Sequence, residues 1–350
     1  MKQVVLYAAL LSAAMVGAYI SWTSDVAPKA AGASQEEVAV YTARAGDVKK
    51  LAFDSEKLKV AVERKTDPKG EYVWVTIEET KEKPAPPKPP PVVDPEDAPD
   101  GEEGPELAPE PEPEPILEVT RTAFLGNDAS DGLFTSFEPL TALRDLDPEG
   151  ADLDVFGLNP AEATIQVARS SGELSIELGG ETYGSKDRYA RYNNRLMLLE
   201  DTTVRPLQFA GTRLVERRLH PLVQNEIDTA VVQRNGQSLG LVQRNKDDRQ
   251  AAFWARKGDE DSKDDVAATW LDKLLRLKAQ SYPDDVDLSG ATESFSVQLT
   301  SGSTTWGFSV LQLPEGDTLY ARSEFNRGVV ELTASLANEA IADLDELFQD

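Results

Sequence analysis

The sequence predicts an α+β protein: a duplicated module of antiparallel sheet with helices on one face, preceded by one N-terminal transmembrane helix. Three observations predict this fold: an uncharged N-terminal run, pairs of short alternating segments joined by turn residues, and the same order of segments in both halves. The expected parts are a cytoplasmic end at 1–3, an anchor at 4–22, a tether at 23–37, a first module at 38–220 with a disordered Pro/Glu-rich insertion at 84–115, and a second module at 221–350.

Composition excludes several classes of function. The chain has 350 residues, enough for one large domain or two ordinary ones. It has no cysteine, which excludes disulfides, thiol nucleophiles and thiolate metal sites. Its net charge is −26, from 62 acidic and 36 basic residues. A surface this acidic repels nucleic acid and anionic lipid headgroups, so we expect no nucleic-acid partner for the globular part.

The N-terminal run has the features of a membrane anchor. Residues 4–22 carry no charge over 19 positions, close to the roughly 20 that cross the hydrocarbon core. Lys2 precedes the run, and Tyr19 and Trp22 stand near its far end, where aromatic rings favour the interface. The alternative is a cleaved signal peptide, but its apolar core would be about 7 to 15 residues long. We therefore expect a single-pass protein of the inner (cytoplasmic) membrane, with its globular part in the periplasm or extracytoplasmic space.

The first module begins with strands and is then interrupted. Residues 58–62 and 72–77 alternate apolar and polar side chains around a Thr-Asp-Pro-Lys-Gly turn, which predicts two strands. Residues 84–115 contain 13 prolines and 10 acidic residues, so they can form no core. We expect an extended, solvated insertion there, and a ligand for a proline-binding partner or a spacer is the functional alternative. Order is predicted again at 116–124.

The remaining elements of the first module follow from periodicity and turn residues. Apolar spacing predicts a helix over 128–146, capped by Asp128, and another over 202–219. Alternation predicts two hairpins, formed by 163–168 with 173–178 and by 188–192 with 196–199.

The second module repeats this order. Asn235-Gly236 is a strong two-residue turn signal between 229–234 and 239–244. A strand at 251–256 carries Trp254 as the strand at 73–77 carries Trp74. The later elements are a helix at 261–279, a hairpin of 294–299 with 304–310, and a closing helix at 331–348. Such internal similarity indicates duplication of one module.

These residues also carry a family resemblance. A Trp strand followed by "FLGNDASDGLFTSFEPLTALRDL", "FGLNPAEATIQV" and "YARYNNRLMLLED" resembles the bacterial family called domain of unknown function 4340. The match covers most of 45–350 and departs from the family through the insertion and a weaker second copy. The resemblance implies a membrane helix, an extracytoplasmic body and an accessory role beside ABC-type export or gliding-motility components, with no catalytic residues to carry over.

We therefore expect a non-enzymatic accessory or scaffold subunit of a cell-envelope complex, with no cofactor. The alternative is a binding module for an envelope ligand such as a glycan, lipid or cation. A Gly-Gln-Ser-Leu-Gly run centred on Ser238 matches the hydrolase elbow, but its flanks are strand-like and the only histidine, His220, precedes it. We expect a hairpin at Ser238 and an ordinary helix-end position for His220.

One acidic run resembles the start of a calcium loop. Residues 145–150 place oxygens at alternating positions and a glycine at the sixth. Phe156 stands where the bidentate glutamate belongs, although Asp152 and Asp154 offer oxygens nearby. The competing interpretation is a plain acidic loop, so no metal site is predicted.

The two Tyr-Ala-Arg units are the candidate binding residues: Tyr189 and Arg191 in the first copy, Tyr320 and Arg322 in the second. Tyrosine and arginine are the usual anchors of interfaces, so the functional hypothesis is a binding surface. The structural alternative is a tyrosine in the core and an arginine paired with a local carboxylate, and it is favoured because tyrosine is common in strands by propensity.

Overall fold

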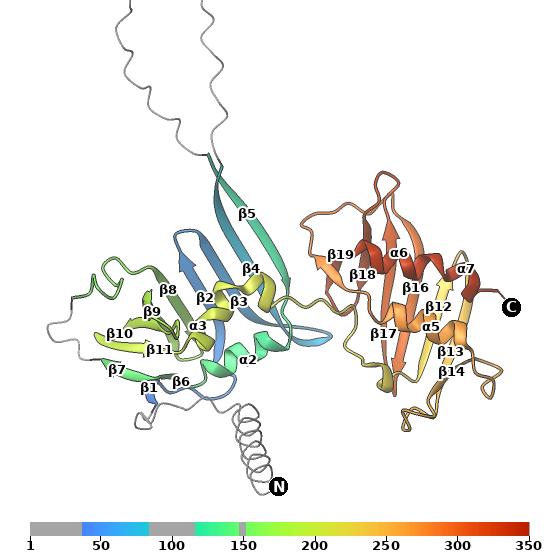
Figure 1. Cartoon of the computed structure of the whole chain (residues 1–350), viewed down its shortest axis with the longest axis horizontal. Coiled ribbons are helices and arrows are strands. Elements are labelled where there is room, and N and C mark those ends of the chain that lie inside the picture. Colours follow the sequence, from blue (N-terminus) through green and yellow to red (C-terminus); the bar gives the residue numbers. More distant parts are fainter. Residues whose placement is uncertain (1–36, 84–115, 147–151, 350) are drawn as a thin grey trace, which may run out of the picture.

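The fold is α+β and dominated by antiparallel sheets. The computed structural model describes residues 37–83, 116–146 and 152–349 (Figure 1). The predicted anchor at 4–22 and the insertion at 84–115 lie outside the described residues. Over the described ranges, no helix combines the length and the apolar character that crossing a membrane requires.

The first lobe is built on a nine-stranded antiparallel sheet in the order β5-β4-β3-β2-β8-β9-β10-β11-β7. A two-stranded sheet of β1 and β6 lies beside it. The strands are β1 (Val38–Tyr41), β2 (Val48–Ser55), β3 (Leu58–Asp67), β4 (Gly70–Lys83), β5 (Ile116–Leu125), β6 (Leu140–Ala142), β7 (Arg144–Leu146), β8 (Ala163–Arg169), β9 (Gly172–Glu181), β10 (Arg188–Tyr192) and β11 (Arg195–Leu199).

The helices of the first lobe are shorter than the sequence predicts. They are α2 (Asp128–Ser136), α3 (Asp201–Gln208) and α4 (Ala210–Arg213). The predicted helix over 128–146 is wrong in its second half, because Pro139 disfavours helical backbone at the residue before it and the chain then pairs with β1 and β11. Its cap is Asn127 rather than Asp128, since the Asn127 side chain accepts from the backbone N–H of Ala129 at 3.0 Å.

The second lobe has an eight-stranded antiparallel sheet in the order β14-β13-β12-β16-β17-β18-β19-β15. Its strands are β12 (Thr229–Arg234), β13 (Gln237–Arg244), β14 (Phe253–Arg256), β15 (Ala279–Ser281), β16 (Thr292–Ser301), β17 (Thr304–Gln312), β18 (Leu319–Ser323) and β19 (Gly328–Leu332). Its helices are η1 (Gln224–Glu226), α5 (Asp265–Leu274), α6 (Ala334–Ala342) and α7 (Leu344–Leu347).

The other predicted helices are also shorter than the sequence predicts. The helix expected over 261–279 starts at Asp265, behind an Asp264 side chain that accepts from the Ala267 N–H at 2.8 Å. It ends at Leu274, and Ala279, the last residue of the expected range, begins β15, which pairs with β19. The helix expected from 331 begins at Ala334, because Glu331 belongs to β19. The expected helix at 202–219 likewise ends at Arg213, where the chain extends to meet the end of β5.

The two sheets have the same strand order. Read from one edge, β4-β3-β2-β8-β9-β10-β11-β7 corresponds strand by strand to β14-β13-β12-β16-β17-β18-β19-β15. The helices occupy matching places in the chain, with α2 between β4 and β8 as α5 lies between β14 and β16, and with α3 and α4 after β11 as α6 and α7 follow β19. The first lobe has one additional strand, β5, which comes after the insertion in sequence and pairs with β4 from Trp74 to Lys83.

Each sheet buries one face against its helices. In the second lobe the fully buried Trp270 of α5 packs edge-on against Phe295 at 5.6 Å and donates from Nε1 to the carbonyl of Ala340 at 2.8 Å. The two strand tryptophans are not equivalent. Trp254 lies on the helix side and is buried, whereas Trp74 lies half-buried on the open face, because successive strand residues point to opposite faces.

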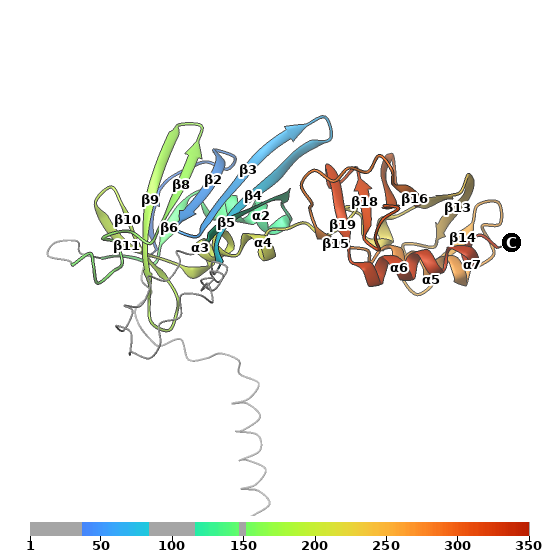
Figure 2. The same cartoon turned by 90° about the horizontal axis from the view of Figure 1, so that it is seen from above.

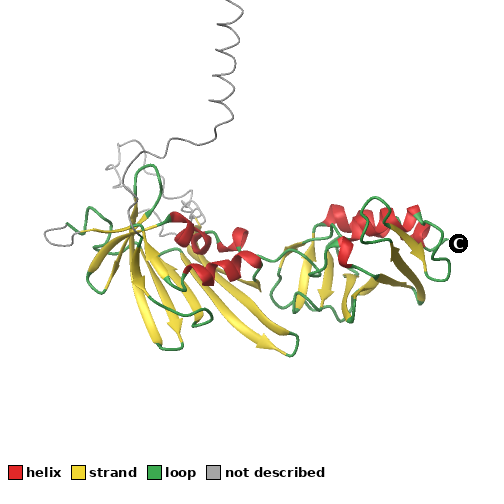
Figure 3. Cartoon of the chain, turned by 90° about the horizontal axis from the view of Figure 1, so that it is seen from below, coloured by secondary structure: helices red, strands yellow, loops and turns green. Residues whose placement is uncertain are grey.

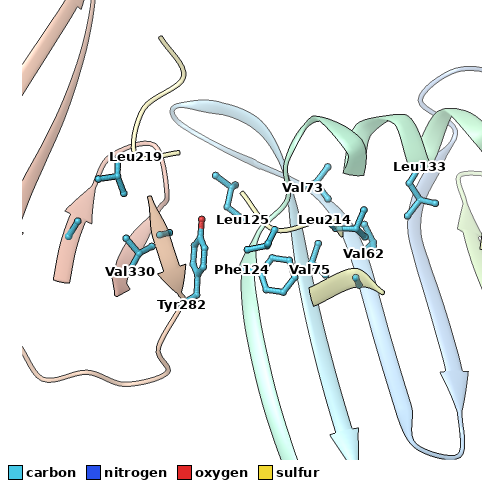
Figure 4. Close-up of a cluster of buried hydrophobic side chains, with 14 of the residues drawn as sticks. Val62, Val73, Val75, Phe124, Leu125, Leu133, Leu214, Leu219, Tyr282 and Val330 are labelled. Atoms are coloured by element: carbon cyan, nitrogen blue, oxygen red, sulfur yellow. The ribbon is translucent and has the colours of Figure 1, made fainter. Parts of the chain in front are cut away.

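The lobes meet through a small apolar contact. Figure 4 shows Tyr282 and Leu219 on one side of the junction and Phe124 and Leu125 on the other. The rings of Phe124 and Tyr282 are 6.1 Å apart, and the Tyr282 hydroxyl donates to the carbonyl of Glu216 at 2.8 Å. Figures 2 and 3 show the helices of both lobes on the same side of the molecule, so the helix-free face of each sheet looks to the other side.

Candidate functional site

The four predicted binding residues lie on equivalent strands of different sheets. Tyr189 and Arg191 are on β10, and Tyr320 and Arg322 are on β18. The alanine between them is fully buried in both copies, so the tyrosine and arginine point to the open, helix-free face. The structure does not bring the two pairs together into one surface (Figure 1).

In the first lobe the arginine is neutralised by its neighbour. Arg191 donates from Nε to a carboxylate oxygen of Glu177 at 2.5 Å, across the β9–β10 pair. This hydrogen bond raises the pKa of the Arg191 guanidinium above its usual value. Tyr189 packs edge-on against Phe156, with ring centres 4.7 Å apart. Arg191 therefore has the local carboxylate that the structural alternative predicts, whereas Tyr189 lies half-buried on the open face and not in the core.

In the second lobe the equivalent arginine has no such partner. Arg322 stands opposite Ser309 on β17, in the register that places Arg191 opposite Glu177. Among the residues that the structure describes, no carboxylate lies within ion-pair distance of Arg322. Its side chain is exposed. A serine thus replaces the one glutamate that would neutralise it.

The difference extends along a whole row of cross-strand neighbours. In the second sheet the row is Gln233, Ser296, Ser309 and Arg322. In the first sheet the row is Asp54, Thr164, Glu177 and Arg191. Over these four strands the first row has one arginine against two carboxylates, and Lys59, opposite Asp54 on the next strand, brings its formal charge to zero. The second row has one arginine among neutral residues, with Ser238 opposite Gln233, so its formal charge is +1.

The second row forms the floor of a trough. The hollow has a volume of about 740 Å³ over β12, β16, β17 and β18. The hollow is deep at these positions because Ser296 and Ser309 have small side chains and Gly307 has none. A Cβ added to Gly307 would lie 3.7 Å from a Glu324 carboxylate oxygen, in ordinary contact. The trough therefore remains open for lack of side-chain volume rather than through backbone strain.

The first lobe closes one end of the trough. The β3–β4 turn brings Lys69 to the carbonyl of Glu324, to which it donates at 3.3 Å, and Arg327 lies 3.2 Å from a carboxylate oxygen of Asp67. The Arg327 guanidinium also stacks over the Tyr72 ring at 4.6 Å. These wall charges pair with one another, since Lys69 also lies 3.9 Å from a Glu324 carboxylate oxygen. Arg322 is the charge of the trough that no described carboxylate compensates.

The other sequence hypotheses resolve differently. Ser238 lies within β13 opposite Gln233, behind a turn whose Asn235 and Gly236 have φ of 50° and 79°, so the predicted hairpin is confirmed and the strand–turn–helix of an elbow is not formed. His220 follows α4 by several residues, so the predicted helix-end position is wrong. Its ring is buried and stacks over Phe308 at 6.3 Å.

The acidic run at 145–154 is only partly described, because 147–151 lie outside the described residues. Asp145 accepts two hydrogen bonds from the Arg195 guanidinium, at 2.9 and 2.7 Å. Asp154 accepts from Asn159 at 2.8 Å. Over the described ranges, no group of three histidine, aspartate or glutamate side chains is arranged to hold a metal ion.

Sequence reasoning identified Arg322 but missed the rest of the trough. The pairing of Ser296 with Ser309 follows from the predicted hairpin around Ser301-Gly302, so that part was within reach. Asp67 and Lys69, which form the wall, are 260 and 255 residues away from their partners, so no local sequence pattern predicts these contacts.

Comparison with known proteins adds no further constraint. No family model, no curated protein and no solved structure matches the chain.

Proposed function

We propose that this protein is a non-enzymatic, membrane-anchored scaffold or accessory subunit of a cell-envelope complex. We also propose that the trough of its second lobe binds an acidic group of a partner protein. The resemblance of the chain to the domain of unknown function 4340 family supports the setting, with the run at 4–22 as anchor and the body in the extracytoplasmic space. The observation that carries the binding role is the uncompensated Arg322 on the trough floor, in a chain of net charge −26.

The chemistry of the trough favours an anionic group with polar surroundings. A guanidinium binds a carboxylate through two parallel hydrogen bonds, which are stronger than neutral ones. The serines and the glutamine of the same row offer further donors and acceptors across three strand spacings, about 14 Å. The positive row argues against a cation, one of the alternative ligands, whereas its hydroxyl and amide groups also suit an acidic glycan.

Duplication explains why only one copy would bind. The identical strand order of the two sheets supports one module used twice. The copies differ at the position opposite the arginine, glutamate at 177 and serine at 309. In this proposal Arg191 of the first copy forms an internal ion pair, whereas Arg322 of the second copy is available to bind an external partner.

The test is affinity purification from membranes solubilised in several gentle detergents. We expect the wild-type chain to recover a membrane complex. Arg322→Gln should weaken recovery about 10- to 100-fold, since a hydrogen bond to a charged group contributes roughly 1.5–3 kcal/mol. Ser309→Glu should do the same, because it rebuilds the neutralising pair of the first lobe.

Arg191→Gln is the matched control, since it removes the same side chain from the equivalent strand of the other sheet. It should leave the complex intact. Recovery of the chain alone in every detergent would contradict the scaffold role. Equal loss with Arg191→Gln and Arg322→Gln would contradict the assignment of the trough, and recovery of a glycan in place of a protein would favour the alternative of a ligand-binding module.

A further inference from the structure

A second hollow lies in the second lobe and shares no residue with the trough. It has a volume of about 610 Å³ between the segment that follows α4, residues 218–224, and the end of α5, residues 272–278. That volume is within the roughly 300–1,000 Å³ of small-molecule sites. Five of its eleven lining residues are aliphatic and none is Phe, Tyr or Trp. The aliphatic residues are Leu219, Leu222, Val223, Leu275 and Leu277.

The rim of this pocket is positive. Arg218, Arg276 and Lys278 line it against the single carboxylate of Asp272. Arg218 is already paired, with Glu216 at 2.6 Å. Arg276 donates from Nε to the backbone carbonyl of Asp272 at 3.1 Å. Within the described ranges neither Arg276 nor Lys278 forms an ion pair, so two exposed cations stand at the mouth of an aliphatic pocket.

A buried histidine lies behind the pocket. His220 lines the pocket and is only 7% exposed. Its Nδ1 is buried and has no surface that a ligand could reach. Burial lowers the pKa of His220 to about 4, against a hydrogen bond to the Leu222 backbone that raises it. At neutral pH the ring is therefore uncharged, with one nitrogen that donates and one that accepts.

We propose that this pocket binds an amphipathic carboxylate of the fatty-acid class. The hydrocarbon chain lies against Leu222, Val223 and Leu275, and the carboxylate lies at the rim between Arg276 and Lys278. Aliphatic walls without an aromatic platform disfavour a sugar. The absence of a matching anionic rim excludes an amphiphile with a positive head.

The inference goes beyond the proposed function and does not depend on it, because it uses none of the trough residues. The experiment uses the full chain in lipid nanodiscs and a 12-carbon fatty acid that carries a diazirine in its chain. After photolysis, peptide mapping should place the label within 218–224 and 272–278. The amide analogue of the same chain, which has no charge, should label these segments about 3- to 10-fold less, as expected for the loss of exposed ion pairs.

Two variants test the roles of the groups. Arg276→Glu with Lys278→Glu should reduce labelling about 3- to 10-fold, whereas Arg213→Glu with Lys257→Glu reverses two exposed cations away from the pocket and should change nothing. The proposal is overturned if the label lies outside the two segments, if the amide labels equally, or if the variant with Arg276→Glu and Lys278→Glu labels as strongly as the wild type.

Discussion

Acidification should destabilise the fold through His220, the one histidine of the chain, because the fold buries its ring. Burial lowers its pKa from 6.5 to about 4. Between these values the unfolded chain binds a proton and the folded chain does not, so stability falls as pH falls from about 6.5 to about 4 and is fully present above that range.

The magnitude follows from linkage. Each unit of pKa difference corresponds to about 1.4 kcal/mol. Protonation of the histidine in the unfolded chain therefore lowers the free energy of unfolding by almost nothing at pH 7.5, by about 2 kcal/mol at pH 5 and by about 3 kcal/mol at pH 4. Protonation of carboxylates also lowers the free energy of unfolding at acid pH. Hydrogen bonding to Lys50 lowers the pKa of Glu63, and hydrogen bonding to Lys246 lowers that of Asp228.

The assay separates these contributions. The free energy of unfolding in urea is measured at pH 7.5 and pH 5 for the wild type and for His220→Phe, which cannot titrate at this position. Carboxylate losses occur in both proteins and cancel in the difference. We expect the wild type to lose about 2 kcal/mol more than the variant over this range. Parallel losses, or a folded-state titration of His220 near 6.5 by NMR, would refute the reasoning.

Three further outcomes follow from the contacts described above. Arg327→Ala should lower the free energy of unfolding by about 1.5–3 kcal/mol, since it removes the hydrogen bond to Asp67 and the guanidinium that stacks on the Tyr72 ring. Unchanged urea midpoints would contradict the role of Arg327 at the junction. Trp270→Phe should cost about 1–3 kcal/mol because it leaves the Ala340 carbonyl unpaired in the core, whereas Trp74→Phe on the open face should cost less, so the reverse order would contradict the burial argument. Gly307→Leu should fill the trough and abolish partner recovery while changing thermal stability little, and retained recovery would contradict the trough as the binding site.

The hairpins were predictable from the sequence, and the helix lengths were not. Asn235-Gly236 accepts the positive φ of a tight turn, so local chemistry alone determines that hairpin. Pro139 is a local signal that ends the helix before Leu140. The apolar spacing beyond it suits a helix and a strand equally, and pairing with β1, about 100 residues away in sequence, selects the strand. Helix ends at β15 and β19 were missed for the same reason, because those residues pair with strands from elsewhere in the chain.

The candidate site was also predictable only in part. The exposed arginine at 322 could be predicted, since the alternation of Tyr-Ala-Arg places it on the face opposite a buried alanine. Whether a carboxylate neutralises it depends on the residue across the strand pair, Glu177 in one copy and Ser309 in the other. The wall of the trough depends on a contact between residues 67 and 327, which no local pattern encodes.

Strand β4 connects two distant points of the molecule. It runs without interruption for 14 residues from Gly70, beside the turn that walls the trough, to Lys83, where the acidic, proline-rich segment leaves the sheet. At about 3.3 Å per residue these points are roughly 45 Å apart. Strand β4, supported by β3 and β5 on either side, is therefore a continuous connection between the point where residue 84 follows and the turn that carries the Lys69 contact with the second lobe.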